Sequence, residues 1–202
     1  MKLKKYITLS CFFLGVLYTQ GQTVNIGEVS VLPNTQMSIL DNFDNQAPAI
    51  FMNDGELFLY SNLNNDGLLS FSTGGTTSLT RFEGSSTQHI SGSVLSEFYD
   101  VLFNNLSPQP AFELSGEISI FNEADFDSGI LQNDGFGGTV IFEQLADHIS
   151  TSNDSHVDGV TQKNGDTTFE YPIGDGGFYR SAIISAPDNV TDVYTGKYFL
   201  EN

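Results

Sequence analysis

Short apolar clusters alternate with polar turns along the chain from Thr23 onward, and their spacing is nearly constant. The clusters are rich in β-branched and aromatic residues, which is typical of short β-strands rather than helices. Two interleaved series of clusters recur at intervals of about 20 residues, and such self-similarity indicates a repeat array. The first series begins at Met37, Leu57, Leu79, Tyr99, Ile118 and Thr139, and the second at Val29, Ala49, Leu68, Gln88, Ala111, Ile130 and His148.

This period predicts an all-β fold, a parallel β-helix. A coil of about 20 residues with two or three short strands makes one turn of such a solenoid. Each strand then pairs with its equivalents in the neighbouring coils, and alternate side chains point into a shared core. The stretch 82–105 reads as one complete coil. The predicted inward side chains are Met37, Ile39, Leu57, Leu59, Phe82, Val101, Phe103, Ile118, Ile120, Val140 and Phe142.

Polar turn signals separate the predicted strands. Gly at these corners supplies a positive φ, and Asn or Asp hydrogen-bonds to its own backbone. The same signals also suit the hairpins of a β-sandwich, which stays the alternative fold, although sandwich loops usually vary more in length. The corners are Asn53-Asp54-Gly55, Asn65-Asp66-Gly67, Ser91-Gly92-Ser93, Leu114-Ser115-Gly116 and Asn133-Asp134-Gly135.

The repeat pattern covers residues 22–151 and breaks after Thr151. Two further strands are expected at Thr168–Tyr171 and Tyr179–Ser185, around a tight Gly-rich loop. Because a solenoid needs a terminal cap over its last coil, residues 152–202 are predicted to be that cap, a β-hairpin or sandwich-like segment, or the start of a following β domain. The last residues read as a strand without an end signal, so we expect the chain to be an N-terminal fragment of a longer protein.

Residues 1–21 have the pattern of a cleaved secretory signal peptide. Lys2, Lys4 and Lys5 precede an apolar core at 6–18, and small residues lie at the predicted cleavage site before Gln22. The apolar core is too short for a membrane anchor, which needs about 20 residues. The only cysteine, Cys11, lies within this leader, so the mature chain has no disulfide. We therefore expect a secreted or cell-surface protein with no membrane insertion after cleavage.

The mature chain is strongly acidic. Without its leader it keeps four of the seven basic residues and all 25 acidic residues, a formal charge of −21. Such a surface is a poor partner for nucleic acid or anionic lipid, because both require clustered Lys or Arg. The carboxylates are expected chiefly to keep an exported protein soluble.

Carboxylates are the first candidates for chemistry. Glu123, Asp125 and Asp127 would lie on one side of an extended segment, as a pair in a glycosidase groove would, but a solvated turn is the simpler interpretation. Six Asp residues in Asn/Gly-rich loops suit the oxygen chemistry of Ca²⁺ without matching any known calcium motif, so calcium is possible and no cofactor is predicted. These residues are Asp41, Asp44, Asp54, Asp66, Asp134 and Asp175.

Other motifs give little support for catalysis. His89, His148 and His156 lack zinc-ligand spacing; His89 is expected on the coil surface, and His148 and His156 in an exposed loop. No Gly-x-Ser-x-Gly motif occurs, and Gly135–Gly138 lacks the Lys and helix of a phosphate loop, so that loop is expected to be structural. Five aromatic residues would stack on sugar rings if they lined an outer face, although the core is the more common place for them. These residues are Phe98, Tyr99, Phe136, Phe178 and Tyr179.

Two phrases carry a family resemblance. The first is Phe82-Glu83-Gly84-Ser85, Gln88–Ser93, Phe98–Val101 and Asn104-Asn105, and the second runs from Val157-Asp158-Gly159 through Pro172-Ile173-Gly174 to Tyr179-Arg180. Together they resemble a repeat of large secreted Bacteroidetes proteins and the phrase that follows it. The resemblance implies an exported, adhesin-like β-helical region of the type IX secretion or gliding-motility-associated kind. The C-terminal sorting module of such proteins is not found in this sequence.

These observations favour a secreted or cell-surface structural and adhesion region that contacts glycans or other surfaces and is not an enzyme. No catalytic, cofactor or metal residue is assigned from the sequence, and the oligomeric state is left open. One alternative is a β-helical carbohydrate-active enzyme, a polysaccharide lyase or hydrolase. The other is a scaffold whose activity resides in a missing C-terminal module. A groove in which two carboxylates converge beside Arg81 or Arg180 would favour the enzyme.

Overall fold

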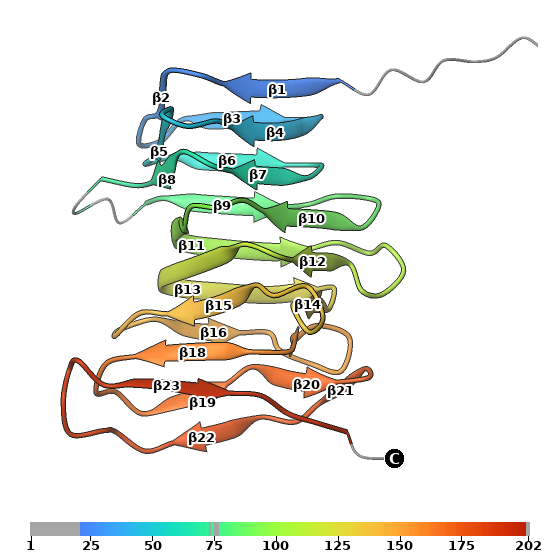
Figure 1. The fold of residues 1–202 in the computed structure, drawn as a ribbon, viewed down its shortest axis with the longest axis vertical. Coiled ribbons are helices and arrows are strands. Elements are labelled where there is room, and N and C mark those ends of the chain that lie inside the picture. Colours follow the sequence, from blue (N-terminus) through green and yellow to red (C-terminus); the bar gives the residue numbers. More distant parts are fainter. Residues whose placement is uncertain (1–20, 73, 75–76, 201–202) are drawn as a thin grey trace, which may run out of the picture.

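The computed structural model describes residues 21–72, 74 and 77–200, and within them the chain is an all-β solenoid of about six coils (Figure 1). This confirms the predicted parallel β-helix over the β-sandwich. The predicted signal peptide lies outside the described residues. Among the described residues, no helix has the length and hydrophobicity to span a membrane.

The coil has three faces, each a stack of parallel strands in register. Face 1 is made of β1 (Gln22–Asn25), β4 (Asn42–Asn45), β7 (Leu63–Asn65), β10 (Gln88–Ser91), β12 (Phe112–Leu114), β14 (Leu131–Gln132), β17 (Val157–Asp158) and β20 (Ile173–Asp175). Face 2 is made of β2 (Glu28–Val31), β5 (Ile50–Asn53), β8 (Leu68–Ser70), the first halves of β11 (Ser96–Asn104) and β13 (Glu117–Ser128), β15 (Thr139–Phe142) and β18 (Thr161–Asn164). Face 3 is made of β3 (Gln36–Ile39), β6 (Glu56–Leu59), β9 (Leu79–Phe82), the second halves of β11 and β13, and β16 (Asp147–Ile149).

The repeat period identified the coil but not the faces. The first cluster series follows face 3 as far as the second half of β11 and passes to face 2 at Ile118. The second moves from face 2 to face 1 at Gln88 and ends on face 3 at His148. The reason is that β11 and β13 are long strands that continue around a corner. At this corner Phe98 is opposite Ile120 and Asp100 is opposite Glu123, so one residue of β11 faces two of β13 in a β-bulge.

Aromatic stacks fill the core. Phe82, Phe103 and Phe126 lie in register on successive coils, with stacked ring centroids 5.6 and 5.3 Å apart. Each such pair stabilises the fold by about 0.5–1.5 kcal/mol beyond its buried area. The predicted inward side chains are all buried except Met37, which is half-buried because it belongs to the first coil.

A ladder of buried Asn side chains stabilises the corner between faces 1 and 2. Asn25 Nδ2 donates to Asn45 Oδ1 over 2.9 Å, and Asn45 Nδ2 donates to Asn65 Oδ1 over 2.7 Å. Asn45 Nδ2 also donates to the Leu68 carbonyl at 3.0 Å. The ladder therefore satisfies backbone groups that the turn removes from the sheets, as buried polar groups require.

The prediction that corner glycines supply positive φ is right at Gly92 and Gly135 and wrong at Gly116; it is also wrong at Gly55 and Gly67. At these two positions the backbone of the preceding coil comes too close for any side chain. A Cβ would lie 2.4 Å from the Leu32 carbonyl oxygen at Gly55 and 2.5 Å from the Ala49 carbonyl oxygen at Gly67.

Antiparallel strands cover the C-terminal end of the stack. β18 pairs with β23 (Val193–Gly196), β20 pairs with β21 (Phe178–Tyr179), and β19 (Phe169–Tyr171) pairs with β22 (Ala182–Ile184). These pairings form a C-terminal cap at the opposite end of the stack from β1 (Figure 1). Parallel stacking on face 1 continues to β20, beyond residue 151 where the sequence pattern breaks.

Candidate binding surface

The acidic residues singled out in the sequence lie on a strand and not in a turn. Glu123, Asp125 and Asp127 belong to β13 and alternate with the buried Ala124 and Phe126. The prediction of a solvated turn was wrong because the inward small and aromatic residues extend the strand around the corner. The carboxylates therefore point outward from a rigid sheet.

Parallel stacking aligns Glu123 with other acids. Asp100, Glu123 and Asp147 are in-register neighbours on three successive coils. Partial burial and the charges of Asp100, Asp125 and Asp147 raise the pKa of Glu123. Burial also raises the pKa of Asp100, and hydrogen bonds from Asn122 Nδ2 (2.6 Å) and the Glu123 N–H (3.2 Å) only partly offset it. We call Asp100, Glu123, Asp125 and Asp147 the acidic column.

An aromatic cluster lies beside the acidic column at the corner between faces 2 and 3. Tyr99, Phe121 and Asn122 are the residues of the β-bulge between β11 and β13. Phe71 contacts both rings edge to face, with centroids 5.6 Å from Tyr99 and 5.2 Å from Phe121. All three rings are partly exposed. We call Phe71, Tyr99 and Phe121 the aromatic ridge.

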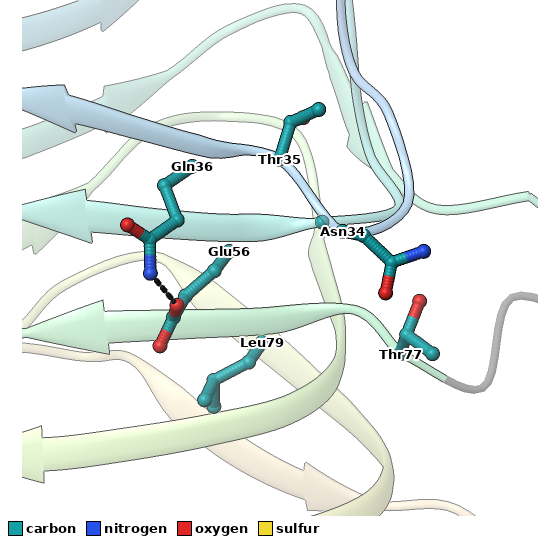
Figure 2. Close-up of a pocket in the computed structure, with 7 residues that line it drawn as sticks. Asn34, Thr35, Gln36, Glu56, Thr77 and Leu79 are labelled. Atoms are coloured by element: carbon teal, nitrogen blue, oxygen red, sulfur yellow. Dashed lines mark hydrogen bonds between the residues drawn. The ribbon is translucent and has the colours of Figure 1, made fainter.

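A shallow hollow of about 480 Å³ lies further toward the N-terminal end of the same corner (Figure 2). Its lining combines amide, hydroxyl and carboxylate groups with one aliphatic side chain, and Gln36 points toward Glu56 across it. The lining residues are Asn34, Thr35, Gln36, Gly55, Glu56, Thr77 and Leu79. Together with the acidic column and the aromatic ridge, this hollow forms what we call the corner surface.

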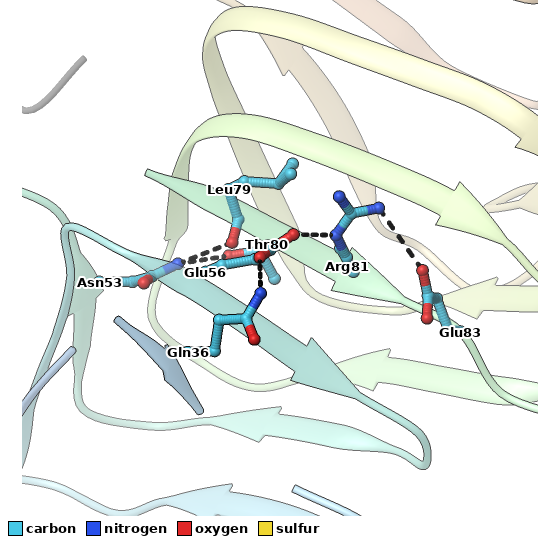
Figure 3. Close-up of polar contacts among 7 residues, drawn as sticks. All are labelled: Gln36, Asn53, Glu56, Leu79, Thr80, Arg81 and Glu83. Carbon is cyan, nitrogen blue, oxygen red and sulfur yellow. Dashed lines mark hydrogen bonds and ion pairs between the residues drawn. The ribbon is translucent and has the colours of Figure 1, made fainter. Parts of the chain in front are cut away.

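Arg81 lies between two carboxylates at the edge of the hollow (Figure 3). Its Nε donates to Glu56 at 2.5 Å, its Nη1 is 3.6 Å from Glu83, and its guanidinium lies 5.4 Å from the centre of the Phe58 ring. Partial burial raises the pKa of Glu56, but hydrogen bonds from Gln36 and Arg81 and the charge of Arg81 outweigh it, so the net pKa is lowered. Glu56 is therefore ionised at neutral pH.

The loop aspartates hydrogen-bond to neighbouring residues rather than gather together. Asp54 accepts from Ser72, and Asp66 accepts from Ser93 and Asn64. Asp134 forms an ion pair of 2.6 Å with Lys197. Within the described ranges no three His, Cys, Asp or Glu side chains are placed to hold a metal ion, so calcium keeps no assigned site.

The histidine prediction was wrong for two of the three residues. His89 is exposed and lies 2.8 Å from Glu113. His156 is fully buried with Nδ1 2.9 Å from the Ser152 carbonyl, and His148 is half-buried with Nε2 2.7 Å from the Glu170 carbonyl. Burial lowers the pKa of both of these rings. Their separation of eight residues in the sequence could not show that the fold would bury the His156 ring and half-bury the His148 ring.

Lys163 was missed by the sequence analysis. It occupies an inward position of β18, in the column of Phe98, Ile120 and Phe142. Its Nζ donates to the carbonyls of residues 143, 144 and 146 at 2.6, 2.9 and 3.1 Å, and burial lowers its pKa to about 8. Lys163 therefore donates to backbone carbonyls at the corner between faces 2 and 3, as the Asn ladder does at the corner between faces 1 and 2. A lone Lys in a polar stretch gave no signal of this role.

The remaining aromatic candidates divide between core and surface. Phe98 is buried, whereas Phe136 and Phe178 are exposed and Tyr179 is half-buried. Phe136 lies in the Gly135–Gly138 loop, where Gly135 and Gly137 have positive φ, which suits the structural role expected of that loop. Only Tyr99 belongs to the aromatic ridge, and the pairing of Tyr99 with Phe71 and Phe121 was not apparent from the sequence.

Comparison with known proteins gives no match: no protein-family model fits the chain, and no curated protein and no solved structure is similar to it. The solenoid implied by the resemblance to Bacteroidetes repeat proteins is present in the structure. The membership itself stays a prediction from the two sequence phrases.

Proposed function

We propose that this chain is an exported, non-enzymatic binding rod whose corner surface contacts glycans. The observation that carries the proposal is the aromatic ridge lying directly beside the acidic column on one face of a rigid stack. The secreted or cell-surface location is supported by the leader pattern of residues 1–21.

The chemistry of the corner surface suits sugars. Aromatic rings offer a flat apolar surface to the C–H faces of a pyranose, and Tyr99 adds a polar hydroxyl. The carboxylates of Asp100 and Glu123 accept hydrogen bonds from sugar hydroxyls, and charge-assisted bonds of this kind are the stronger ones. Because the mature chain has a formal charge of −21, a neutral or cationic glycan fits better than a polyuronate.

The position of these groups also reduces the cost of binding. Tyr99 and Phe121 are held by in-register strands of neighbouring coils, and Phe71 packs against both rings. Little side-chain entropy is lost when a ligand contacts rings that are already fixed. The acidic column spans three successive coils, so its carboxylates are presented along the length of a polymer.

The proposal is tested by binding of the exported protein to neutral polysaccharides, with cellulose and xylan as probes, and to a cationic one, chitosan. Tyr99→Ala and Phe121→Ala are expected to weaken binding roughly 3- to 10-fold each, the value of a stacking contact. Phe136→Ala is the matched control, since this exposed ring lies outside the corner surface. Unchanged binding in both ridge variants, or an equal loss in Phe136→Ala, would overturn the proposal.

A carbohydrate-active enzyme is the second candidate, and the observation that favours it is Arg81 between Glu56 and Glu83 beside the hollow. An acid–base mechanism needs one carboxyl that is protonated near neutral pH. The lowered pKa of Glu56 does not suit that role. The carboxyls with a raised pKa, Asp100 and Glu123, belong to the acidic column, and the ion pairs of Arg81 are with Glu56 and Glu83 instead. Binding without turnover therefore ranks first. The third candidate, a scaffold for a further module, predicts no glycan binding by this chain.

A further inference from the structure

The two ends of the solenoid are built differently. At the C-terminal end, β21 and β23 pair antiparallel with the last parallel strands, β20 and β18, and β19 and β22 form a separate two-stranded antiparallel sheet. At the other end, β1, β2 and β3 pair with β4, β5 and β6 on one side, and no described strand pairs with their outer edges (Figure 1). Unpaired edges are sites for association unless charges, prolines or bulges protect them.

The uncovered end is apolar at all three of its corners. Ile26 is 77% exposed, Leu32 is 60% exposed and Leu40 is 72% exposed, and each follows one of the three strands of the first coil. Inside the ring that they form, Val29 and Met37 pack on the core but stay partly exposed. The first coil therefore has exposed apolar side chains at its three corners and partly exposed apolar side chains in its core. Large exposed apolar patches mark interaction sites.

The same end carries almost no charge. Glu28 and Asp41, which directly follows Leu40, are the only charged residues between residues 22 and 41, although the mature chain has a formal charge of −21. Two copies of this chain repel each other over most of their surfaces, but not when these two ends meet. A second copy is therefore the occupant that the charge distribution permits.

The geometry of the coil suits a symmetric pair. A two-fold axis perpendicular to the solenoid axis reverses the direction of every strand in the first coil, so each edge strand meets an antiparallel partner. Corner residues of one copy then face corner residues of the other. We propose that, once residues 1–21 are removed, two copies of the chain associate through the first coils, with β1, β2 and β3 forming continuous sheets across the interface.

The test is sedimentation of the full chain produced by export, with its N-terminus identified by mass spectrometry. The native protein is expected to sediment at micromolar concentration with twice the mass of one chain. Ile26→Glu combined with Leu40→Glu is expected to give a monomer, because it places charges on two corners of each facing end. Both positions are already exposed, so the fold should tolerate the substitutions.

The matched control adds two charges at the opposite end. Ile183→Glu combined with Phe199→Glu changes residues that are 70% and 65% exposed near the C-terminal cap, and the dimer is expected to persist. A monomeric native protein, whether or not it keeps its leader, would overturn the proposal. So would a dimer that only the C-terminal pair of substitutions dissociates. Circular dichroism of both variants establishes that the strands remain folded.

Discussion

Single polar residues decide where this solenoid is stable and where it is strained. The Asn ladder and Lys163 turn inward and donate to corner carbonyls, which would otherwise be buried without partners. Glu123 is the opposite case, because parallel register places it between two other carboxylates. The first group stabilises the fold, and the second lowers its stability when the carboxylates are ionised.

Replacing Glu123 with Gln is expected to stabilise the fold at neutral pH by about 0.5 kcal/mol, the scale of like-charge pairs on neighbouring strands. The folded-state pKa of Glu123 is raised above its unfolded value, so the folded carboxyl binds its proton more readily. The wild type therefore loses stability relative to Glu123→Gln as the pH rises through the folded pKa, and the difference vanishes at lower pH, where both states are protonated.

Urea denaturation of the two proteins at pH 7 and near pH 3 measures this effect. Glu117→Gln is the control, because Glu117 is exposed on the same strand and its in-register neighbour on the next coil is Thr139. Equal stabilisation by both substitutions would show that overall negative charge, rather than the acidic column, is the cause. A Glu123→Gln variant less stable than the wild type would contradict the account.

At the scale of the elements, the coil follows from apolar spacing, but the corners do not. Alternation predicted the buried columns correctly at Phe82, Phe103 and Phe142. The alternation of apolar and polar residues did not reveal that β11 and β13 each continue through a corner. The β-bulge interrupts this alternation, so each long strand looks like two separate apolar clusters. The aromatic ridge arises at that bulge, so the candidate surface was hidden for the same reason.

The Asn ladder gives a prediction for the corner between faces 1 and 2. Asn45→Ala is expected to destabilise the protein by about 2–4 kcal/mol, because the Asn65 side chain and the Leu68 carbonyl each lose a donor while buried. Asn104→Ala, at the half-exposed end of β11, is the matched substitution and should cost under about 1 kcal/mol. Thermal and chemical denaturation measure the stability of both variants. Equal stability of the two would contradict the role of the Asn ladder.

At the scale of the whole molecule, the described residues form a solenoid with antiparallel strands at its C-terminal end and one corner that combines aromatic rings with carboxylates. At its N-terminal end, no described strand pairs with the outer edges of β1, β2 and β3. The period and the net charge were readable from the sequence, and the leader at residues 1–21 stays a prediction. The outward-facing columns could not be read from the sequence, because strand register, and not sequence spacing, brings outward neighbours together in a parallel stack. Asp100 and Asp147 are neighbours of Glu123 only for that reason.

The most direct test of binding without turnover is a time course with one polysaccharide that the purified protein retains. Bound protein and soluble sugar products are measured in the same sample, for the wild type, Tyr99→Ala and Glu56→Gln. The account predicts that Tyr99→Ala reduces retention, that Glu56→Gln retains the fold, and that no protein releases products. Product release by the wild type that Glu56→Gln abolishes would contradict it.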